Sequence, residues 1–411
     1  MTRKVVVTGR GVVSPIGHDW QTTWENLIKG VSGIRALGTV DVSGLPVRIG
    51  GEVVGLDVTE LPLKLVRRTD SSVHIALVAA REAVRDAGLE IGPDLAPRTA
   101  VVLGSAGGPT KLSAAATAAL ADRGAKGLSP YYFPGSSVDS AASEVALYFG
   151  AQAASICMVT ACATGATSIG EAMKLIIDGD ADVVIAGGVD DTMTRLDITG
   201  AAMSRALSRR NDDPAAACRP FDRDRDGFVM SAGGGVVVLE GADHALGRGA
   251  RIHAELAGYG TTTDAFHITA PQPEGLSAQR AMRIALGKAG LSPSEIDYVN
   301  AHGTSTKLND TTEIRALRGV FGERATHLPV SSIKSMTGHM LGAAGAVELI
   351  TAIETIHTGV VPPTINCHVP EDPEMNFVPH LPQRHEVNAV MSNSFGFGGH
   401  NAVLVARRWA A

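Results

Sequence analysis

Short apolar runs and longer amphipathic stretches alternate along most of the chain. Residues 4–8, 99–103 and 181–188 are mostly apolar over their whole length, which is typical of strands buried on both faces. Between such runs, stretches such as 71–87 carry apolar residues at helical spacing. Strands that alternate with helices predict a mainly parallel sheet covered by helices on both faces. We therefore expect an α/β protein.

The alternation starts again after about residue 250. Residues 251–260 resemble the opening strand with its glycine turn, and 329–332 followed by 338–356 repeat the order of strand, turn and small-residue helix seen at 154–177. This similarity is faint, and a general α/β rhythm would also produce it. We interpret the chain as two halves of similar topology, 1–250 and 251–411.

One cysteine stands between a predicted strand and a predicted helix. Residues 154–160 are predicted to form a buried strand, and the helix that follows ends before Gly179, with Cys162 at the junction. A cysteine there faces the positive end of the helix dipole and free N–H groups, which favours thiolate. Cys162 is then a candidate nucleophile. The alternative is a buried structural cysteine, but Ala161 and Ala163 beside it would let a substrate approach.

Two histidines lie in glycine-rich turns after predicted strands. His302 lies in Asn300-Ala-His-Gly-Thr-Ser-Thr, and His339 follows Lys334 in Lys-Ser-Met-Thr-Gly-His. A lone histidine is more often structural than catalytic. Two of them in turns built of small residues, with a nearby lysine and a helix-capped cysteine elsewhere, favour a catalytic site.

Composition narrows the function classes. The chain has 411 residues, enough for two domains or one large duplicated fold, and a net charge of −6, which argues against nucleic acid as a partner. No apolar run reaches 18 residues, and the N-terminus enters a strand without a signal-peptide core. The four cysteines have neither metal-ligand spacing nor a disulfide pattern. We expect a cytoplasmic protein that contacts no membrane and needs neither a metal nor a cofactor.

Four motifs in order along residues 3–408 carry a family resemblance. They are Thr160-Ala-Cys-Ala-Thr-Gly, Asn300-Ala-His-Gly-Thr-Ser-Thr, Val330-Ser-Ser-Ile-Lys-Ser-Met-Thr-Gly-His and Asn393-Ser-Phe-Gly-Phe-Gly-Gly. With these motifs the chain resembles the β-ketoacyl-acyl carrier protein synthases of the elongating, type II class, in the thiolase superfamily. The resemblance implies a thiolase-like five-layered αβαβα fold built from two similar halves, the first carrying the cysteine and the second both histidines.

The same resemblance implies a reaction and its residues. The reaction is decarboxylative Claisen condensation of a Cys162-bound acyl chain with malonyl-acyl carrier protein, giving 3-oxoacyl-acyl carrier protein. His302 and His339 would serve decarboxylation and condensation, and Lys334 would orient the site. The backbone N–H groups of Cys162 and Phe397 would form an oxyanion hole, and Phe397 would also gate the acyl pocket.

The resemblance also implies binding partners. An acyl carrier protein would bring its phosphopantetheine arm to Thr304 and Thr306. The expected docking residues are basic: Arg67, Arg68, Lys126 and Arg205. The positions that match supporting residues, in some relatives around a monovalent cation, are Glu313, Glu348, Asn393 and Ser394.

Two segments depart from the fatty-acid synthase pattern. Residues 229–235 lack the usual Gly-acid-Gly, and Thr306-Lys-Leu-Asn-Asp replaces the usual Thr-Pro-x-Gly-Asp. The second form resembles ketosynthase subunits of type II polyketide systems, which work beside a chain-length-factor subunit. Both pathways stay open, and so do a homodimer and a heterodimer, either of which would pair through residues 154–160.

Two rival functions are weaker. A non-catalytic, chain-length-factor-like subunit would lack the cysteine, whereas this chain has Cys162 and both histidines. A thiolase would use a second cysteine late in the chain, but Cys367 lies in a proline-rich loop without the right neighbours.

Overall fold

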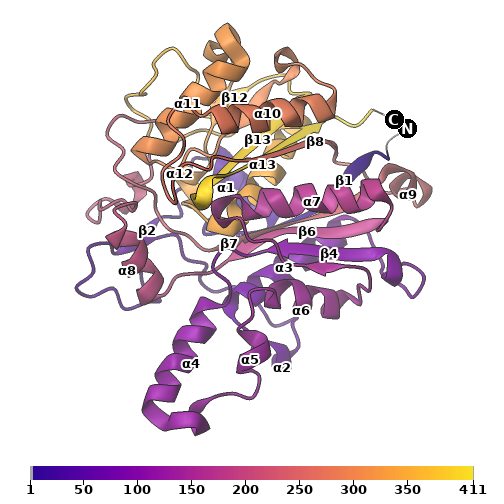
Figure 1. Ribbon diagram of the computed structural model, residues 1–411, viewed down its shortest axis with the longest axis vertical. Coiled ribbons are helices and arrows are strands. Elements are labelled where there is room, and N and C mark those ends of the chain that lie inside the picture. The colour runs from indigo at the N-terminus through magenta and orange to yellow at the C-terminus, as the bar shows by residue number, and fades with distance from the viewer. Residues whose placement is uncertain (1–2, 411) are drawn as a thin grey trace.

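The computed structural model describes residues 3–410, and its centre is a mixed sheet of ten strands in the order β10-β9-β13-β14-β8-β1-β7-β6-β4-β5 (Figure 1). The strands are β1 (Val5–Val13), β4 (Thr99–Gly104), β5 (Ser155–Ile156), β6 (Val183–Asp190), β7 (Gly233–Gly241), β8 (Ala254–Thr263), β9 (Tyr298–Asn300), β10 (Val330–Ser331), β13 (Ala389–Gly396) and β14 (His400–Arg407). Two small sheets pair β2 (Arg35–Ala36) with β3 (Ile49–Gly50) and β11 (Val360–Val361) with β12 (Gln383–Arg384).

Helices cover this sheet and lie between its halves. The helices are α1 (Trp20–Ile28), α2 (Leu63–Val66), α3 (Ser71–Asp86), α4 (Thr110–Arg123), α5 (Tyr132–Gly135), α6 (Ser140–Phe149), α7 (Thr164–Asp178), α8 (Arg195–Met203), α9 (Ala242–Gly247), α10 (Leu276–Ala289), α11 (Lys307–Phe321), α12 (Lys334–Thr337) and α13 (Ala344–Thr358). Within residues 3–410, no helix combines the length and the apolar character that a membrane crossing requires.

The ten strands form two five-stranded halves with the same topology. β1 and β8 pair through only two residue pairs, whereas β8 and β14 pair through eight. Outward from that seam, the orders β1-β7-β6-β4-β5 and β8-β14-β13-β9-β10 correspond strand for strand. In each half the first two pairings are antiparallel and the last two parallel. The two similar halves are therefore confirmed, but the expected mainly parallel sheet is wrong, because antiparallel strands covered on both faces give the same apolar runs.

Five layers follow from where the apolar side chains pack. α3 and α6 share one core with the outer face of the first half-sheet. α7 and α13 lie between the two half-sheets in a second core, and α10 and α11 cover the outer face of the second half-sheet. Figure 1 shows this stacking, with α10 and α11 at one side of the molecule and α3 and α6 at the other. The αβαβα prediction is confirmed.

The two central helices meet through a reciprocal pair of glycines. A Cβ at Gly165 of α7 would lie 2.9 Å from the backbone nitrogen of Ala346, and one at Gly345 of α13 would lie 2.8 Å from that of Ala166. Each helix has 15 residues and follows a short 3₁₀ turn, residues 161–163 and 341–343. The first residue of each turn has a φ of 48°. The conformation of the turn that carries Cys162 therefore occurs a second time in the fold, at residues 341–343.

The segment that leads to this cysteine differs from its prediction. Instead of a buried strand over residues 154–160, β5 has two residues, and both are exposed in the single chain. Val159 is also 53% exposed. β5 is the last strand of the sheet and pairs only with β4, so its other edge pairs with no strand of the described chain.

Two helices beside this edge project from the molecule. None of the residues of α4 and α5 is buried, and Figure 1 shows both helices extending beyond the layers. Phe133 of α5 is 87% exposed.

Candidate active site

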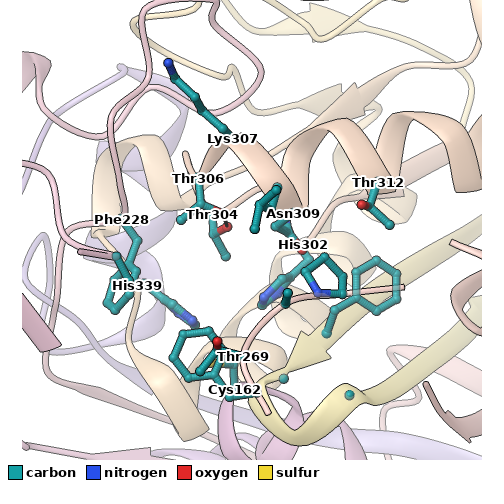
Figure 2. Close-up of a pocket in the computed structure, with 18 of the residues that line it drawn as sticks. Cys162, Phe228, Thr269, His302, Thr304, Thr306, Lys307, Asn309, Thr312 and His339 are labelled. Atoms are coloured by element: carbon teal, nitrogen blue, oxygen red, sulfur yellow. Dashed lines mark hydrogen bonds between the residues drawn. The ribbon is translucent and has the colours of Figure 1, made fainter. Parts of the chain in front are cut away.

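Cys162, His302 and His339 line one cavity of about 340 Å³. They come from three different turns: the one before α7, the one after β9 and the one after α12. Figure 2 shows both imidazoles turned toward the middle of the cavity, above Cys162, with Thr304 and Thr306 on the opposite side. The fold thus brings together the three residues that the sequence singled out as candidate chemistry.

The thiol of Cys162 faces two backbone donors. The backbone N–H groups of Phe397 and of Cys162 itself lie close enough to Sγ to lower the pKa of the thiol, and the charge of Lys334 also lowers it. Burial acts in the other direction and prevails, raising the pKa to about 11. The expected preference for thiolate at the helix N-terminus is therefore wrong for the free site: at neutral pH it holds a thiol.

The glycine-rich loop at residues 396–399 lies directly on this turn. A Cβ at Gly396 would lie 2.6 Å from the carbonyl oxygen of Thr160, so only glycine permits the approach. Gly398 and Gly399 have φ values of 83° and 77°, in the left-handed region. Phe397, between Gly396 and Gly398, is 42% exposed. The loop therefore carries a backbone donor to the sulfur and leaves its aromatic ring partly free.

The tautomer of His302 follows from its contact with Lys334. Lys334 is fully buried, and its Nζ donates to the backbone oxygen of His302 at 2.6 Å and to Nδ1 at 3.3 Å, and also to Glu348. An ammonium is only a donor, so Nδ1 accepts and Nε2 carries the proton. Burial and the charge of Lys334 hold the pKa of His302 well below its usual value. The ring is thus a neutral donor through Nε2.

His339 is the second neutral imidazole. Its side chain is 1% exposed, and burial together with the charge of Lys334 holds its pKa well below the usual value. Both ring nitrogens lack a hydrogen-bond partner in the described chain. Its backbone N–H donates to the oxygen of Val229 at 2.7 Å, and the ring lies 5.4 Å from that of His302, nearly perpendicular to it. A buried imidazole without a hydrogen-bond partner is available to form a hydrogen bond with a ligand.

Buried carboxylates hold the turn that carries His302. Glu313 of α11 accepts from the backbone N–H groups of His302 and Gly303, at 2.9 and 2.8 Å. Burial nevertheless raises the pKa of Glu313 to about 7. Asp310 accepts from the N–H of Thr304 at 3.0 Å. The family resemblance implies Glu313 as a residue that supports the site, whereas it does not imply this role for Asp310.

A further buried carboxylate, which the sequence did not reveal, joins the loop after β4 to the second of the two repeated turns. Asp190, at the end of β6, accepts from the backbone N–H groups of Ala106, Gly107 and Gly342, at 3.0, 3.0 and 2.6 Å. Burial raises its pKa to about 6. No local signal could have identified this role, because these partners lie 83 to 152 residues away in the sequence.

Several buried side-chain oxygens have no hydrogen-bond partner within the described residues. They are Asn300 Oδ1, Glu348 Oε2, Ser392 Oγ, Asn393 Oδ1 and Ser394 Oγ. Oxygens of this kind are the ligands that hard cations take in proteins. They fit the monovalent cation that the family resemblance implies, although the described residues hold no cluster of three histidine, cysteine or acidic ligands.

The predicted docking residues differ in their environment. Arg67, Lys126 and Arg205 are exposed and form no ion pair with the described residues, and Arg205 also lines the cavity. Arg68 instead makes a bidentate pair with Glu144, which is 7% exposed. The charge of Arg68 is thus paired within the chain, whereas the charges of the other three residues are not, and docking at all four stays a prediction.

Comparison with known proteins decides the family. The model of the β-ketoacyl synthase N-terminal domain matches residues 2–245, and that of the C-terminal domain matches residues 253–368. This chain belongs to the β-ketoacyl synthase family. Its curated relatives include 3-oxoacyl-acyl-carrier-protein synthase 2 of Staphylococcus aureus (strain COL), 47% identical over 412 residues, with 100% of this chain and 99% of that protein covered. The protein of that name from Coxiella burnetii is 44% identical and covers 99% of both chains.

Solved structures give the same answer for the fold. The ishigamide ketosynthase/chain length factor structure matches with a TM-score of 0.92 at 34% identity, over 100% of both chains. A type II polyketide acyl-carrier protein in complex with its ketosynthase, bound to the hexaketide, matches with a TM-score of 0.90 at 33% identity, also over 100% of both chains. The predicted family, thiolase-like fold and acyltransferase class are confirmed: the chain is a condensing enzyme.

Proposed function

We propose that Cys162 carries the growing acyl chain and that His302 and His339 drive its condensation with a malonyl unit on a carrier protein. One observation carries the assignment: a thiol and two neutral imidazoles line a single cavity, and Lys334 sets the tautomer of one imidazole. Neutral N–H donors beside a nucleophile suit the oxyanions of thioester chemistry.

In the first half-reaction, the sulfur of Cys162 attacks the carbonyl carbon of an acyl thioester. The thiol proton passes to the departing pantetheine sulfur as the old carbon–sulfur bond breaks. The oxyanion that forms in between is bound by the N–H groups of Cys162 and Phe397, which already face the sulfur. Deprotonation accompanies attack, because burial keeps the resting group a thiol.

In the second half-reaction, a malonyl thioester loses CO₂ as its carbon–carbon bond breaks. The electron pair forms an enolate, and its oxygen accepts hydrogen bonds from Nε2–H of His302 and from His339. The enolate carbon attacks the acyl group on Cys162 and displaces the sulfur as a thiolate. The 3-oxoacyl product forms, and the thiolate takes up a proton from water to restore the free enzyme. A monovalent cation held by Asn300, Asn393 and their neighbours would add positive potential near this site.

The partner proposals come from relatives and from exposed surfaces. A solved relative is described as a complex with its acyl-carrier protein, and another as a ketosynthase/chain length factor. We assign the carrier's arm to Thr304 and Thr306, which line the cavity, and its acidic surface to the basic residues Arg67, Lys126 and Arg205. The free edge of β5 and the projecting α4 and α5 would pair with a second copy or a homologous subunit.

We further propose that the functional halves are residues 1–250 and 251–411, since the strand order repeats across that boundary. The cytoplasm is the proposed compartment. It agrees with the absence of any disulfide among the four cysteines, all of which fall within residues 3–410.

A labelled acyl-carrier protein tests the assignment of Cys162. Mass spectrometry after mixing should find one acyl group on the peptide that contains Cys162 and none in Cys162→Ala. The variant should still release CO₂ from malonyl-carrier protein, because both histidines remain. Label retained by Cys162→Ala would overturn the role of this residue. The same variant with His302 or His339 also replaced by alanine is the control, and it should release CO₂ at least a hundredfold more slowly.

A further inference from the structure

Positive charges that have no counterion lie along the wall of the cavity. Lys307, the first residue of α11, and Arg205 both line it. Both side chains are exposed, and neither forms an ion pair within the part of the chain that the structure describes. Leu308, the next residue, is 63% exposed and also lines the cavity. This stretch of the wall therefore lies at the opening to solvent.

The acidic residues that line the same cavity are already engaged. Asp226 accepts from the N–H of Arg209 at 3.1 Å and lies 3.8 Å from the side chain of Arg210. Asp264 accepts from the side chain of Asn401 at 2.8 Å and from the N–H of Gln272 at 2.9 Å. Arg210 compensates the charge of Asp226, so the two cations Lys307 and Arg205 outweigh the remaining charge of Asp264 in the cavity lining, although the whole chain carries −6.

The order of groups along the cavity matches the order of groups along a pantetheine arm. Figure 2 shows Cys162 and the imidazoles at one end, Thr304 and Thr306 next, and the side chain of Lys307 directed away from them at the far end. A thioester at Cys162 would place the amides of the arm beside the threonine hydroxyls. The phosphate that terminates the arm is a fixed number of bonds from the sulfur, so it must lie near the opening.

We propose that Lys307, together with Arg205, binds the phosphate of the phosphopantetheine arm, so that the enzyme selects phosphorylated arms over pantetheine itself. This inference rests on the proposed function. An anion at a fixed distance from the reacting sulfur suits a fixed lysine, whereas the acidic side chains of a carrier protein are not tied to that distance. Proline, which the usual family pattern has at position 307, offers neither a charge nor a donor.

Two thioesters that differ only in the phosphate provide the test. The rate of acylation of Cys162 is measured with an acyl-phosphopantetheine and with the matching acyl-pantetheine. Lys307→Ala should raise KM for the phosphorylated arm about fivefold to tenfold, the effect of losing one exposed charge-assisted hydrogen bond, and leave kcat unchanged. KM for acyl-pantetheine should not move. Lys307→Arg should restore most of the preference, and Lys29→Ala, which removes an exposed lysine elsewhere, is the control.

The outcomes separate this proposal from the proposed function. An equal rise in KM for both arms, or no rise for either, would overturn the phosphate site. If neither arm acylated Cys162 in the wild-type enzyme, the proposed function would fail instead. Calorimetric titration of Cys162→Ala with phosphopantetheine and with pantetheine then still tests Lys307. Equal affinity for the two would overturn the proposal, and a preference for phosphopantetheine that Lys307→Ala removes would uphold it.

Discussion

The contact between Lys334 and His302 gives the sharpest prediction. Lys334 is fully buried between His302 and Glu348. Replacing it alone would leave the carboxylate of Glu348 buried without a partner, which costs about 3–5 kcal/mol. The double variant Lys334→Met/Glu348→Gln removes both charges, so its stability should stay close to that of the wild type. It isolates the effect of Lys334 on the histidine.

The expected loss falls on condensation. Without the ammonium, Nδ1 of His302 has no donor, and Nε2 no longer carries the proton in every molecule. Removing one oxyanion donor lowers kcat by about 10²–10³-fold, and we expect condensation to fall within that range. Acylation should fall less than condensation, because Lys334 acts on Cys162 only through its charge, which lowers the pKa of the thiol.

The assay follows each half-reaction separately. Intact-protein mass spectrometry measures acylation in a single turnover, and release of CO₂ from malonyl-carrier protein measures the second step. The wild-type enzyme is the control, because Glu348→Gln alone would leave the ammonium of Lys334 buried without its partner. If the double variant condensed within threefold of this control, Lys334 would not set the tautomer of His302. An equal loss in both half-reactions would also refute the assignment.

Three further results are expected. Gly165→Val should lower the free energy of unfolding in urea by about 1–3 kcal/mol, because its Cβ would lie 2.8 Å from the oxygen of Gly342. An unchanged midpoint of urea unfolding would contradict the close contact between the two helices. The rate of alkylation of Cys162 by iodoacetamide should rise about tenfold per pH unit between pH 7 and 10, because the thiolate fraction increases with pH until the pKa of about 11 is reached. A rate that stops rising below pH 8 would rule out that pKa. Arg67→Glu should raise KM for carrier protein at low salt but not for small thioesters, whereas Arg68→Glu should lower Tm, because it faces the buried Glu144. The opposite pattern would reverse the two roles.

Local sequence was enough to predict the chemistry-bearing turns. Cys162, His302 and His339 each follow a strand signal in a run of small residues, and this pattern reflects a physical need for backbone to approach the ligand. The faint internal similarity of the sequence corresponds to the strand order that the two half-sheets share.

Local sequence patterns could not predict contacts between residues that are far apart in the chain. The hydrogen bond between Asp190 and Gly342 joins residues 152 positions apart, and the sequence around neither residue predicts it. The edge strand β5 was misread for a related reason: an apolar run looks the same whether the surface that covers it belongs to its own chain or to another. Likewise, the charge of Arg68 could not be assigned without knowing that Glu144 lies beside it.

The repeated turn has a consequence for stoichiometry. In the second half, Gly342 occupies the position that Cys162 holds in the first, and a Cβ there would lie 2.5 Å from Asp190 and 2.8 Å from the backbone nitrogen of Ala106. No cysteine side chain fits at that point, so under the proposed role of Cys162 we expect each chain to store a single acyl group. The initial burst of released pantetheine thiol should therefore equal one per copy of this chain. A particle of two copies would release two equivalents, and a particle with a cysteine-free partner would release one.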